Sequence, residues 1–258
     1  MNKIIVTTLL ISSLALTSAG ANLANPAAPL PEARVSLGVS YDLGGYTITN
    51  RQIPMMVNRI HGRISYSPLK YVNLGLDLGA AQVNVERYTV GGDTVPVFEG
   101  EYGFSGGAHL KLTSPMLLNS FSFIALAQGA LFYSENKTNA MYGGKDGAAV
   151  LGMQFKVPNF GFVSFGPQLY MINGENRSYT GAEGTYSNLN NIRGWLAVDF
   201  FPKVDPITNN KPYCSLEFTA SPKINSSSRV PVQEFSISFS IGAVTPRLYG
   251  IETEAEEY

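Results

Sequence analysis

Apolar and polar side chains alternate along short segments of this chain, and the alternation is clearest near its C-terminal end. From Phe235 to Ala243, apolar residues occupy every odd position, and serine or glycine occupies every even position. Successive side chains of a β-strand point to opposite faces. The segment therefore predicts a strand with one apolar face and one face rich in hydroxyl groups.

Ten segments of this kind follow one another along the chain. The predicted strands are Ala33–Asp42, Asn58–Tyr66, Val72–Val85, Phe98–Leu112, Phe121–Tyr133, Ala148–Val157, Phe160–Met171, Ile192–Phe201, Tyr213–Ala220 and Val232–Val244. In the third strand the alternation slips near Ala80 and Ala81, because Val83 and Val85 are the next apolar pair. This slip predicts a β-bulge. Pro167 marks a second irregular position, since proline donates no hydrogen bond to a neighbouring strand.

The connections between these segments alternate in character. Those after the second, fourth, sixth and eighth segments contain Ser67-Pro68, Ser114-Pro115, Pro158-Asn159 and Pro202 to Asn210. The others tend to be longer and richer in Gly, Asn, Ser and Thr, and we expect a long connection from Leu43 to Val57. Short turns at one end and longer loops at the other are typical of an outer-membrane barrel.

The polar faces of the strands distinguish a membrane barrel from a soluble one. A soluble β-sandwich or lipocalin-like barrel also alternates. Its core is not built from Ser, Gly, Asn, Gln and charged residues, because buried polar groups cost free energy unless they are paired. In a membrane barrel the apolar face contacts lipid and the polar face lines the interior. The sequence therefore predicts an all-β fold, an antiparallel up-and-down transmembrane β-barrel of about ten strands, with eight or twelve as alternatives.

The first residues have the pattern of an export signal. Lys3 supplies the positive charge, Ile4 to Leu16 is the apolar stretch, and Ala19-Gly20-Ala21 fits a cleavage site. The apolar stretch is shorter than the roughly 20 residues that a membrane-spanning helix needs. The expected organisation is a cleavable signal peptide (1–21), a flexible lead-in (22–32), the barrel (33–244) and an acidic periplasmic tail (245–258).

The charge content excludes some classes of protein. Charged residues make up 14 % of the chain, against about 25 % in soluble domains. Once the signal peptide with Lys3 is removed, the chain has 17 basic and 19 acidic residues, a net charge of −2. A nucleic-acid partner is not expected, because it requires a basic surface. Cys214 is the only cysteine, so it forms no intrachain disulfide, and we interpret it as a small apolar side chain.

The chain resembles the small single-chain outer-membrane β-barrel proteins of Gram-negative bacteria. The resemblance covers roughly Ala33 to Val244 and rests on the strand pattern. Many members end on an aromatic residue that the assembly machinery reads, and the matching strand here is Glu234 to Val244, with Phe235 and Phe239. The chain departs from that pattern by continuing to Tyr258, in a tail too short for a peptidoglycan-binding domain. The implied partners are outer-membrane lipid, lipopolysaccharide and the barrel-assembly machinery.

Charged side chains at inward positions are the candidate functional residues. The predicted lumen-lining set is His61, Arg63, Asp77, Glu99, Glu101, His109, Lys111, Arg193, Asp199 and Glu217. If Tyr66 pairs with Val72, His61 lies opposite Asp77 and Arg63 opposite Gly75. A His–Asp pair can orient an imidazole as a base. No family motif surrounds either histidine, however, and we expect these groups to fill a narrow lumen with salt bridges.

The expected function is that of a barrel in the cell outer membrane with a narrow, side-chain-filled lumen. Such a barrel has a structural or surface-interaction role through its outside loops. The first alternative is a transport channel for small solutes or hydrophobic molecules, and the second is an outer-membrane enzyme. We expect no catalytic residue, because no motif identifies one. We expect no metal and no cofactor, because neither metal-ligand spacing nor a phosphate-binding loop occurs.

Overall fold

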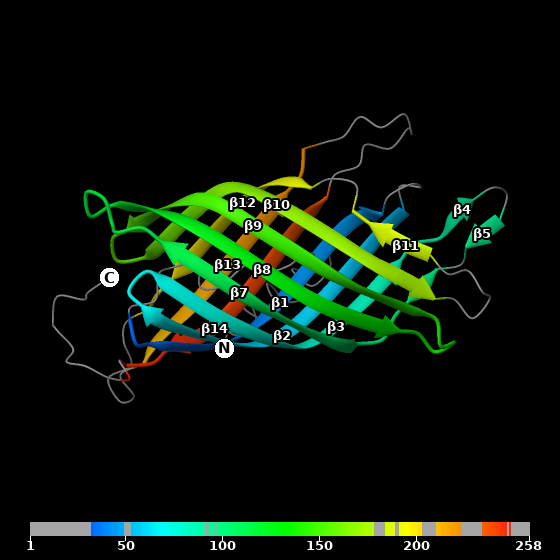
Figure 1. Ribbon diagram of the computed structural model, residues 1–258, viewed down its shortest axis with the longest axis horizontal. Coiled ribbons are helices and arrows are strands. Elements are labelled where there is room, and N and C mark those ends of the chain that lie inside the picture. Colours follow the sequence, from blue (N-terminus) through cyan, green and yellow to red (C-terminus); the bar gives the residue numbers. More distant parts are fainter. Residues whose placement is uncertain are drawn as a thin grey trace, which may run out of the picture.

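The chain folds into a long antiparallel β-barrel (Figure 1). The computed structural model describes residues 32–48, 53–90, 93–95, 97–177, 184–188, 191–202, 210–222, 234–246 and 248. The barrel strands are β1 (Val35–Ile48), β2 (Ile53–Leu69), β3 (Val72–Val85), β7 (Gly103–Thr113), β8 (Phe121–Glu135), β9 (Met141–Val157), β10 (Gly161–Arg177), β12 (Ile192–Phe200), β13 (Lys211–Ala220) and β14 (Phe235–Val244).

These ten strands pair with their neighbours in chain order, and β1 pairs with β14 to close the ring. The predicted fold class is confirmed. Among the described residues, four short strands lie outside the ring: β4 (Tyr88–Val90) and β5 (Asp93–Val95) form a hairpin, β6 (Phe98–Glu99) pairs with β3, and β11 (Gly184–Ser187) pairs with β10. In the part of the chain that the structure describes, no helix is long and apolar enough to cross a membrane.

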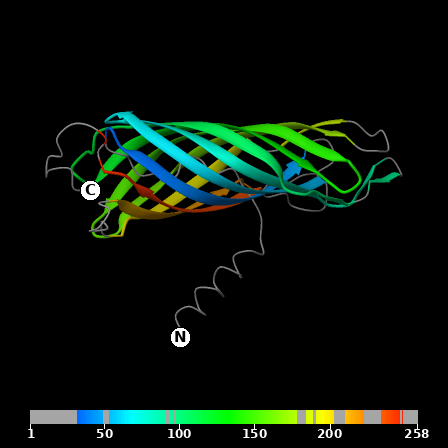
Figure 2. The same cartoon turned by 90° about the horizontal axis from the view of Figure 1, so that it is seen from below.

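The two ends of the barrel differ, as both ribbon views show (Figures 1 and 2). One end carries the connections β2–β3, β7–β8, β9–β10 and β12–β13, and we call it the turn end. The opposite end carries β4, β5 and β11, and we call it the loop end. At the loop end, β8 pairs with β9 as far as Glu135 and Met141, and β10 also pairs with β11.

The expected long connection from Leu43 to Val57 is wrong. Strand β1 continues to Ile48 and β2 begins at Ile53, so most of that stretch is a paired hairpin. The glycines and Pro54 favoured a loop locally, but pairing with the neighbouring strand satisfies the backbone groups of this stretch. Pro54 is exposed on the outer face.

A β-bulge exists near the predicted place but in the opposite strand. The pairing of β3 with β2 runs without a shift through Ala80 and Ala81, and Val83 and Val85 keep the inward phase. The extra residue lies between β6 and β7, where Gly100, Glu101 and Tyr102 stand opposite only two residues of β3. The change of pattern at Ala80 therefore marks a change in which face of β3 is apolar.

The predicted irregularity at Pro167 takes a milder form. The pairing of β9 with β10 is interrupted at Gly166 and Pro167, but the register is the same on both sides of the interruption. The predicted signal peptide (1–21), nearly all of the lead-in (22–32) and most of the tail (245–258) lie outside the described residues.

Candidate functional site

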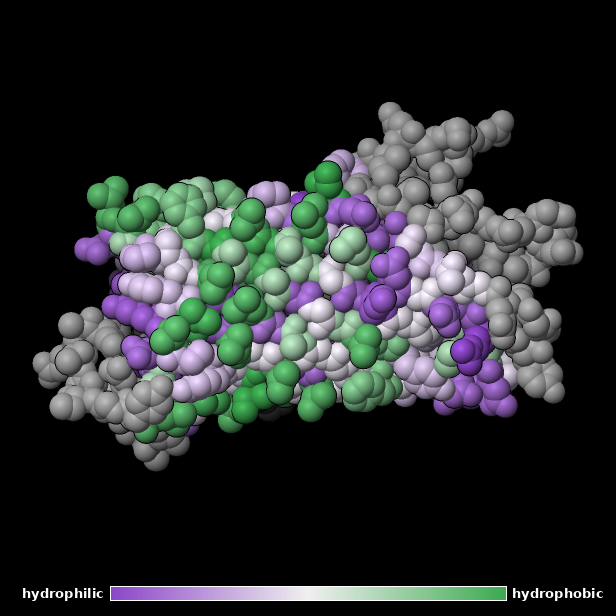
Figure 3. Space-filling view, viewed as in Figure 1, coloured by the Kyte–Doolittle hydropathy of each residue, from purple (hydrophilic) through white to green (hydrophobic). Residues whose placement is uncertain are grey.

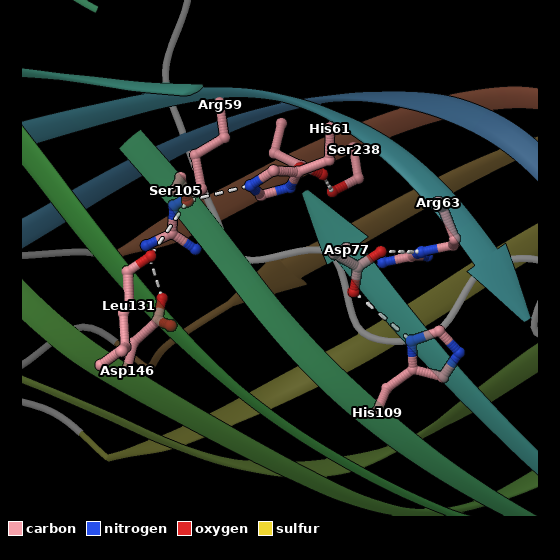
Figure 4. A network of polar contacts seen from close by, with 10 residues as sticks. Arg59, His61, Arg63, Asp77, Ser105, His109, Leu131, Asp146 and Ser238 are labelled. Carbon is pink, nitrogen blue, oxygen red and sulfur yellow. Dashed lines mark hydrogen bonds and ion pairs between the residues drawn. The ribbon is translucent and has the colours of Figure 1, made fainter. Parts of the chain in front are cut away.

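The lumen near the middle of the barrel contains a group of buried ions centred on Asp77 (Figure 4). Asp77 is fully buried and accepts a hydrogen bond from Nε of Arg63. Its second carboxylate oxygen lies 3.4 Å from Nδ1 of His109. Nε2 of His109 lies 3.1 Å from the hydroxyl of Ser65. Three strands, β2, β3 and β7, thus place one carboxylate against two basic side chains.

The predicted pairing of His61 with Asp77 is wrong. The structure pairs Arg63 with Asp77 and His61 with Gly79. Strand β2 continues to Leu69, which pairs with Val72, and a shift of one position between Tyr66 and Leu69 then pairs Tyr66 with Leu74, two positions from the predicted Val72. A shift of two residues keeps each side chain on the same face of the sheet but changes its partner.

His61 has a different carboxylate partner. Its Nδ1 lies 3.5 Å from Oδ2 of Asp42, and its Nε2 lies 2.9 Å from the hydroxyl of Ser105. The hydroxyl of Ser238 donates to Asp42 over 2.7 Å. Both ring nitrogens of His61, like those of His109, therefore have polar neighbours inside the barrel.

The other wall of the lumen supplies acidic groups. Nε1 of Trp195 donates to Glu217 over 3.2 Å, and the hydroxyl of Ser215 donates to Asp199. Lys111 is 1 % exposed and lies in the electrostatic field of the Asp199 and Glu217 carboxylates. A buried ammonium group requires such neighbours, because burial without them costs several kcal/mol.

Toward the loop end, a layer of aromatic and charged side chains crosses the lumen. We call it the cross-barrel layer; it consists of Tyr46, Arg59, Phe132, Asp146, Tyr170, Arg193 and Glu234. The rings of Tyr46 and Tyr170 stack with centroids 5.3 Å apart. The Arg193 guanidinium lies 4.1 Å from the Tyr170 ring centroid and donates to Glu234 over 2.7 Å.

The second half of the cross-barrel layer joins the remaining walls. Nη2 of Arg59 donates to Asp146 over 2.6 Å, and the Tyr170 hydroxyl donates to the same carboxylate over 2.9 Å. The Arg59 guanidinium also lies 5.1 Å from the centroid of the Phe132 ring. Because its members come from β1, β2, β8, β9, β10, β12 and the residue before β14, the layer connects strands all around the ring.

Beyond this layer the interior is apolar. The buried side chains there include Met55, Val57, Val83, Val85, Phe98, Tyr142, Ile172 and Tyr186. Phe98 and Tyr142 pack with ring centroids 4.6 Å apart. The Tyr186 hydroxyl donates to the Gly143 carbonyl, and burial raises the pKa of this phenol well above its usual range. The barrel therefore has a polar section toward the turn end and an apolar section toward the loop end.

Eight of the ten predicted lumen residues are buried inside the barrel: His61, Arg63, Asp77, His109, Lys111, Arg193, Asp199 and Glu217. Glu99 and Glu101 are not, and this part of the prediction is wrong. Both are exposed on the outer face, while Phe98 and Gly100 point inward. The bulge at Glu101 and Tyr102 reverses the alternation of side chains between β6 and β7. Odd-numbered residues therefore face inward in β7, as His109 does, but outward before the bulge.

Sequence reasoning did not identify the cross-barrel layer or the apolar section. Tyr46, Met55 and Asp146 lie in stretches that we expected to be loops. The signal that pointed to the apolar section was the change of pattern at Val83 and Val85, which we interpreted as a bulge.

The two histidines of the lumen are packed among neighbouring side chains. A general base needs a proton of its substrate within hydrogen-bond reach. His61 and His109 are 2 % and 5 % exposed, and neighbouring side chains occupy their ring nitrogens. Among the residues that the structure describes, no group of three or more His, Cys, Asp and Glu residues is arranged to hold a metal ion.

Solved structures that match the chain include the following three. The translocator domain of the autotransporter NalP from Neisseria meningitidis aligns at 10 % identity and a TM-score of 0.47, covering 95 % of each chain. The outer membrane protease OmpT from Escherichia coli aligns at 10 % identity and a TM-score of 0.39, covering 82 % of this chain and 94 % of that one. The toluene transporter TodX from Pseudomonas putida aligns at 8 % identity and a TM-score of 0.32, covering 88 % of this chain and 95 % of that one.

No protein-family model and no curated protein matches the chain. The assignment of the fold therefore rests on the strand pairing and burial described above.

Proposed function

We propose that this chain is an outer-membrane β-barrel protein with a closed lumen, and that it has a structural or surface-interaction role through its loop end. The outward side chains around the turn-end part of the barrel are large, apolar and exposed. They include Leu37, Val39, Ile60, Ile64, Leu74, Leu76, Leu78, Phe104, Leu110, Leu151, Phe165, Leu196 and Ile241. An exposed apolar surface of this extent is typical of a lipid-facing belt.

The belt stops before the loop end, as the surface colouring indicates on one face (Figure 3). Beyond it the outward positions are polar: Asn58, Gln82, Asn84, Lys145, Asn173 and Glu175. In outer-membrane barrels the longer connections lie outside the cell. The loop end therefore projects outward under this proposal, and lipid and lipopolysaccharide surround the belt. Export by the signal peptide and insertion by the barrel-assembly machinery complete the proposal.

The observation that carries the proposal of a closed lumen is the cross-barrel layer. A ten-stranded ring is only slightly wider than the eight-stranded barrels that side chains fill completely. Here Arg59 and Arg193 are 1 % and 2 % exposed and are held by carboxylates and aromatic rings from other strands. A solute would have to displace both ion pairs to pass.

Planar-bilayer conductance tests the closed lumen. The purified protein should show little or no steady current. A double variant, Arg59→Ala with Arg193→Ala, should conduct, because it removes two large side chains from the layer. Lys145→Ala, an outward substitution on β9, is the control and should stay closed. Large, stable openings in the unmodified protein would contradict the closed lumen and favour transport.

A further inference from the structure

A row of small residues crosses the outward face of three neighbouring strands, β10, β12 and β13, and ends at Phe235 of the fourth, β14. Pro167 of β10 pairs with Gly194 of β12, Gly194 pairs with Ala220 of β13, and Ala220 pairs with Phe235 of β14. Pro167, Gly194 and Ala220 are exposed, and the residues that follow or precede them, such as Gln168, Arg193 and Thr219, point into the lumen. The barrel wall is therefore thin along this row.

Large apolar side chains stand on both sides of the row. On the turn-end side, Phe165, Leu196, Phe218 and Ile237 form the next paired row. On the loop-end side stand Ile192 and Pro222. Together they border an open groove of about 800 Å³, which we call the Gly194 groove. Its floor of small residues crosses three strands, a length of about 10 Å at the usual strand spacing.

We propose that the Gly194 groove binds one acyl chain of a membrane lipid, an inference that rests on the proposed insertion of the barrel in a membrane. The groove lies within the apolar belt, since Leu169 and Met171 are exposed on β10 beyond it. Its lining offers apolar side chains and no outward charged group. One row of small residues between two rows of larger side chains sets the width of the groove. A groove of this width suits a single flexible hydrocarbon chain.

A second copy of the protein fits this groove less well. In a two-fold contact the same surface of each copy meets itself. Two grooves would then face each other and leave a void, and an unfilled void forfeits the contacts of its lining. A separate apolar chain removes that void.

The Gly194→Leu variant fills the groove. A Cβ atom at position 194 meets nothing nearer than the Ala220 carbonyl at 3.9 Å, so the added side chain extends into the groove without strain in the wall. Gly62→Leu is the matched control. Gly62 is exposed within the belt, a Cβ there meets nothing nearer than 3.7 Å, and its paired neighbours Val39 and Leu78 are large.

Native mass spectrometry of the full-length protein in mild detergent, with dipalmitoyl phosphatidylglycerol added as the probe, tests the proposal. The unmodified protein and Gly62→Leu should each retain one probe molecule. Gly194→Leu should retain it about tenfold less, because the leucine occupies the apolar surface that the chain would bury. Ala220→Leu, in the same row, should give the same loss. Each variant must show the gel-mobility shift on boiling that a folded barrel gives.

Equal retention by Gly194→Leu and Gly62→Leu would overturn the proposal, as would a probe-free dimer that Gly194→Leu dissociates. The closed lumen, the membrane insertion and the binding of an acyl chain are contradicted by different results. A protein that conducts but retains the probe contradicts only the closed lumen. A protein that needs no detergent contradicts membrane insertion.

Discussion

At the scale of single residues, the charged side chains of the lumen lie against specific partners. Asp77 faces Arg63 and His109, and His61 faces Asp42. All of these side chains are at least 95 % buried. Under these conditions an ion pair that loses one member leaves an uncompensated charge, whereas joint replacement by apolar residues is often tolerated.

We expect Asp77→Leu to destabilise the barrel by about 3–5 kcal/mol, because the Arg63 charge stays buried without its main partner. The double variant with Arg63→Leu should cost clearly less than the sum of the two single changes. Urea unfolding in lipid vesicles, followed by the fluorescence of the single tryptophan, Trp195, measures each free energy. Additive effects would show that the two side chains are not coupled.

At the scale of elements, the bulge between β6 and β7 is held by a side chain from a third strand. The Ser134 hydroxyl of β8 accepts a hydrogen bond from the Val83 amide over 3.1 Å and donates to the Glu101 carbonyl over 2.8 Å. Gly100 makes room for it, since a Cβ there would lie 2.1 Å from the Ser134 oxygen. The hydroxyl thus replaces ladder hydrogen bonds that the extra residue interrupts.

Ser134→Ala should therefore cost about 1–3 kcal/mol, because it leaves the buried Val83 amide without an acceptor. The control is Ser120→Ala in the exposed β7–β8 turn, which should change stability by less than about 0.5 kcal/mol. The same urea titration compares them. If Ser134→Ala is as mild as Ser120→Ala, the bulge does not depend on the hydroxyl.

At the scale of the whole molecule, the barrel reverses its packing along its length. In the turn-end part, charged, hydroxyl and amide side chains face inward together with the apolar Ile124, Leu126 and Phe162, and the outward side chains are mainly apolar. In the loop-end part, Val83, Phe98 and Tyr142 face inward, and Gln82 and Asn84 face outward. The loop-end part is therefore packed like a soluble barrel, and it extends beyond the lipid belt under the proposed topology.

That topology predicts which turns are accessible from outside the cell. In a Cys214→Ser background, Thr138→Cys in the β8–β9 turn should react with a membrane-impermeant maleimide on intact cells. Ser120→Cys in the β7–β8 turn should react only after the outer membrane is permeabilised. Both positions are exposed in the structure. The opposite labelling pattern would mean that the barrel is inserted in the reverse orientation.

The sequence alone predicted a strand number of about ten, with eight and twelve left open, and it determined the closed antiparallel order and the facing of most lumen residues. The period of two in the side-chain pattern carries this information, because each strand must present one face to the interior along its whole length. Where the pattern was uninterrupted, as at His109 and Lys111, the predicted facing agrees with the structure.

Only the tertiary structure decided the partners of those residues and the character of the loop-end part. The pairing of Leu69 with Val72, followed by an irregularity before Tyr66, placed Asp77 opposite Arg63. One extra residue near Glu101 placed Glu99 and Glu101 on the outer face. Both depend on pairing between strands, which the period of a single strand does not encode. Two members of the cross-barrel layer, Tyr46 and Asp146, lie in stretches rich in glycine that became strands because neighbouring strands satisfied their backbone groups.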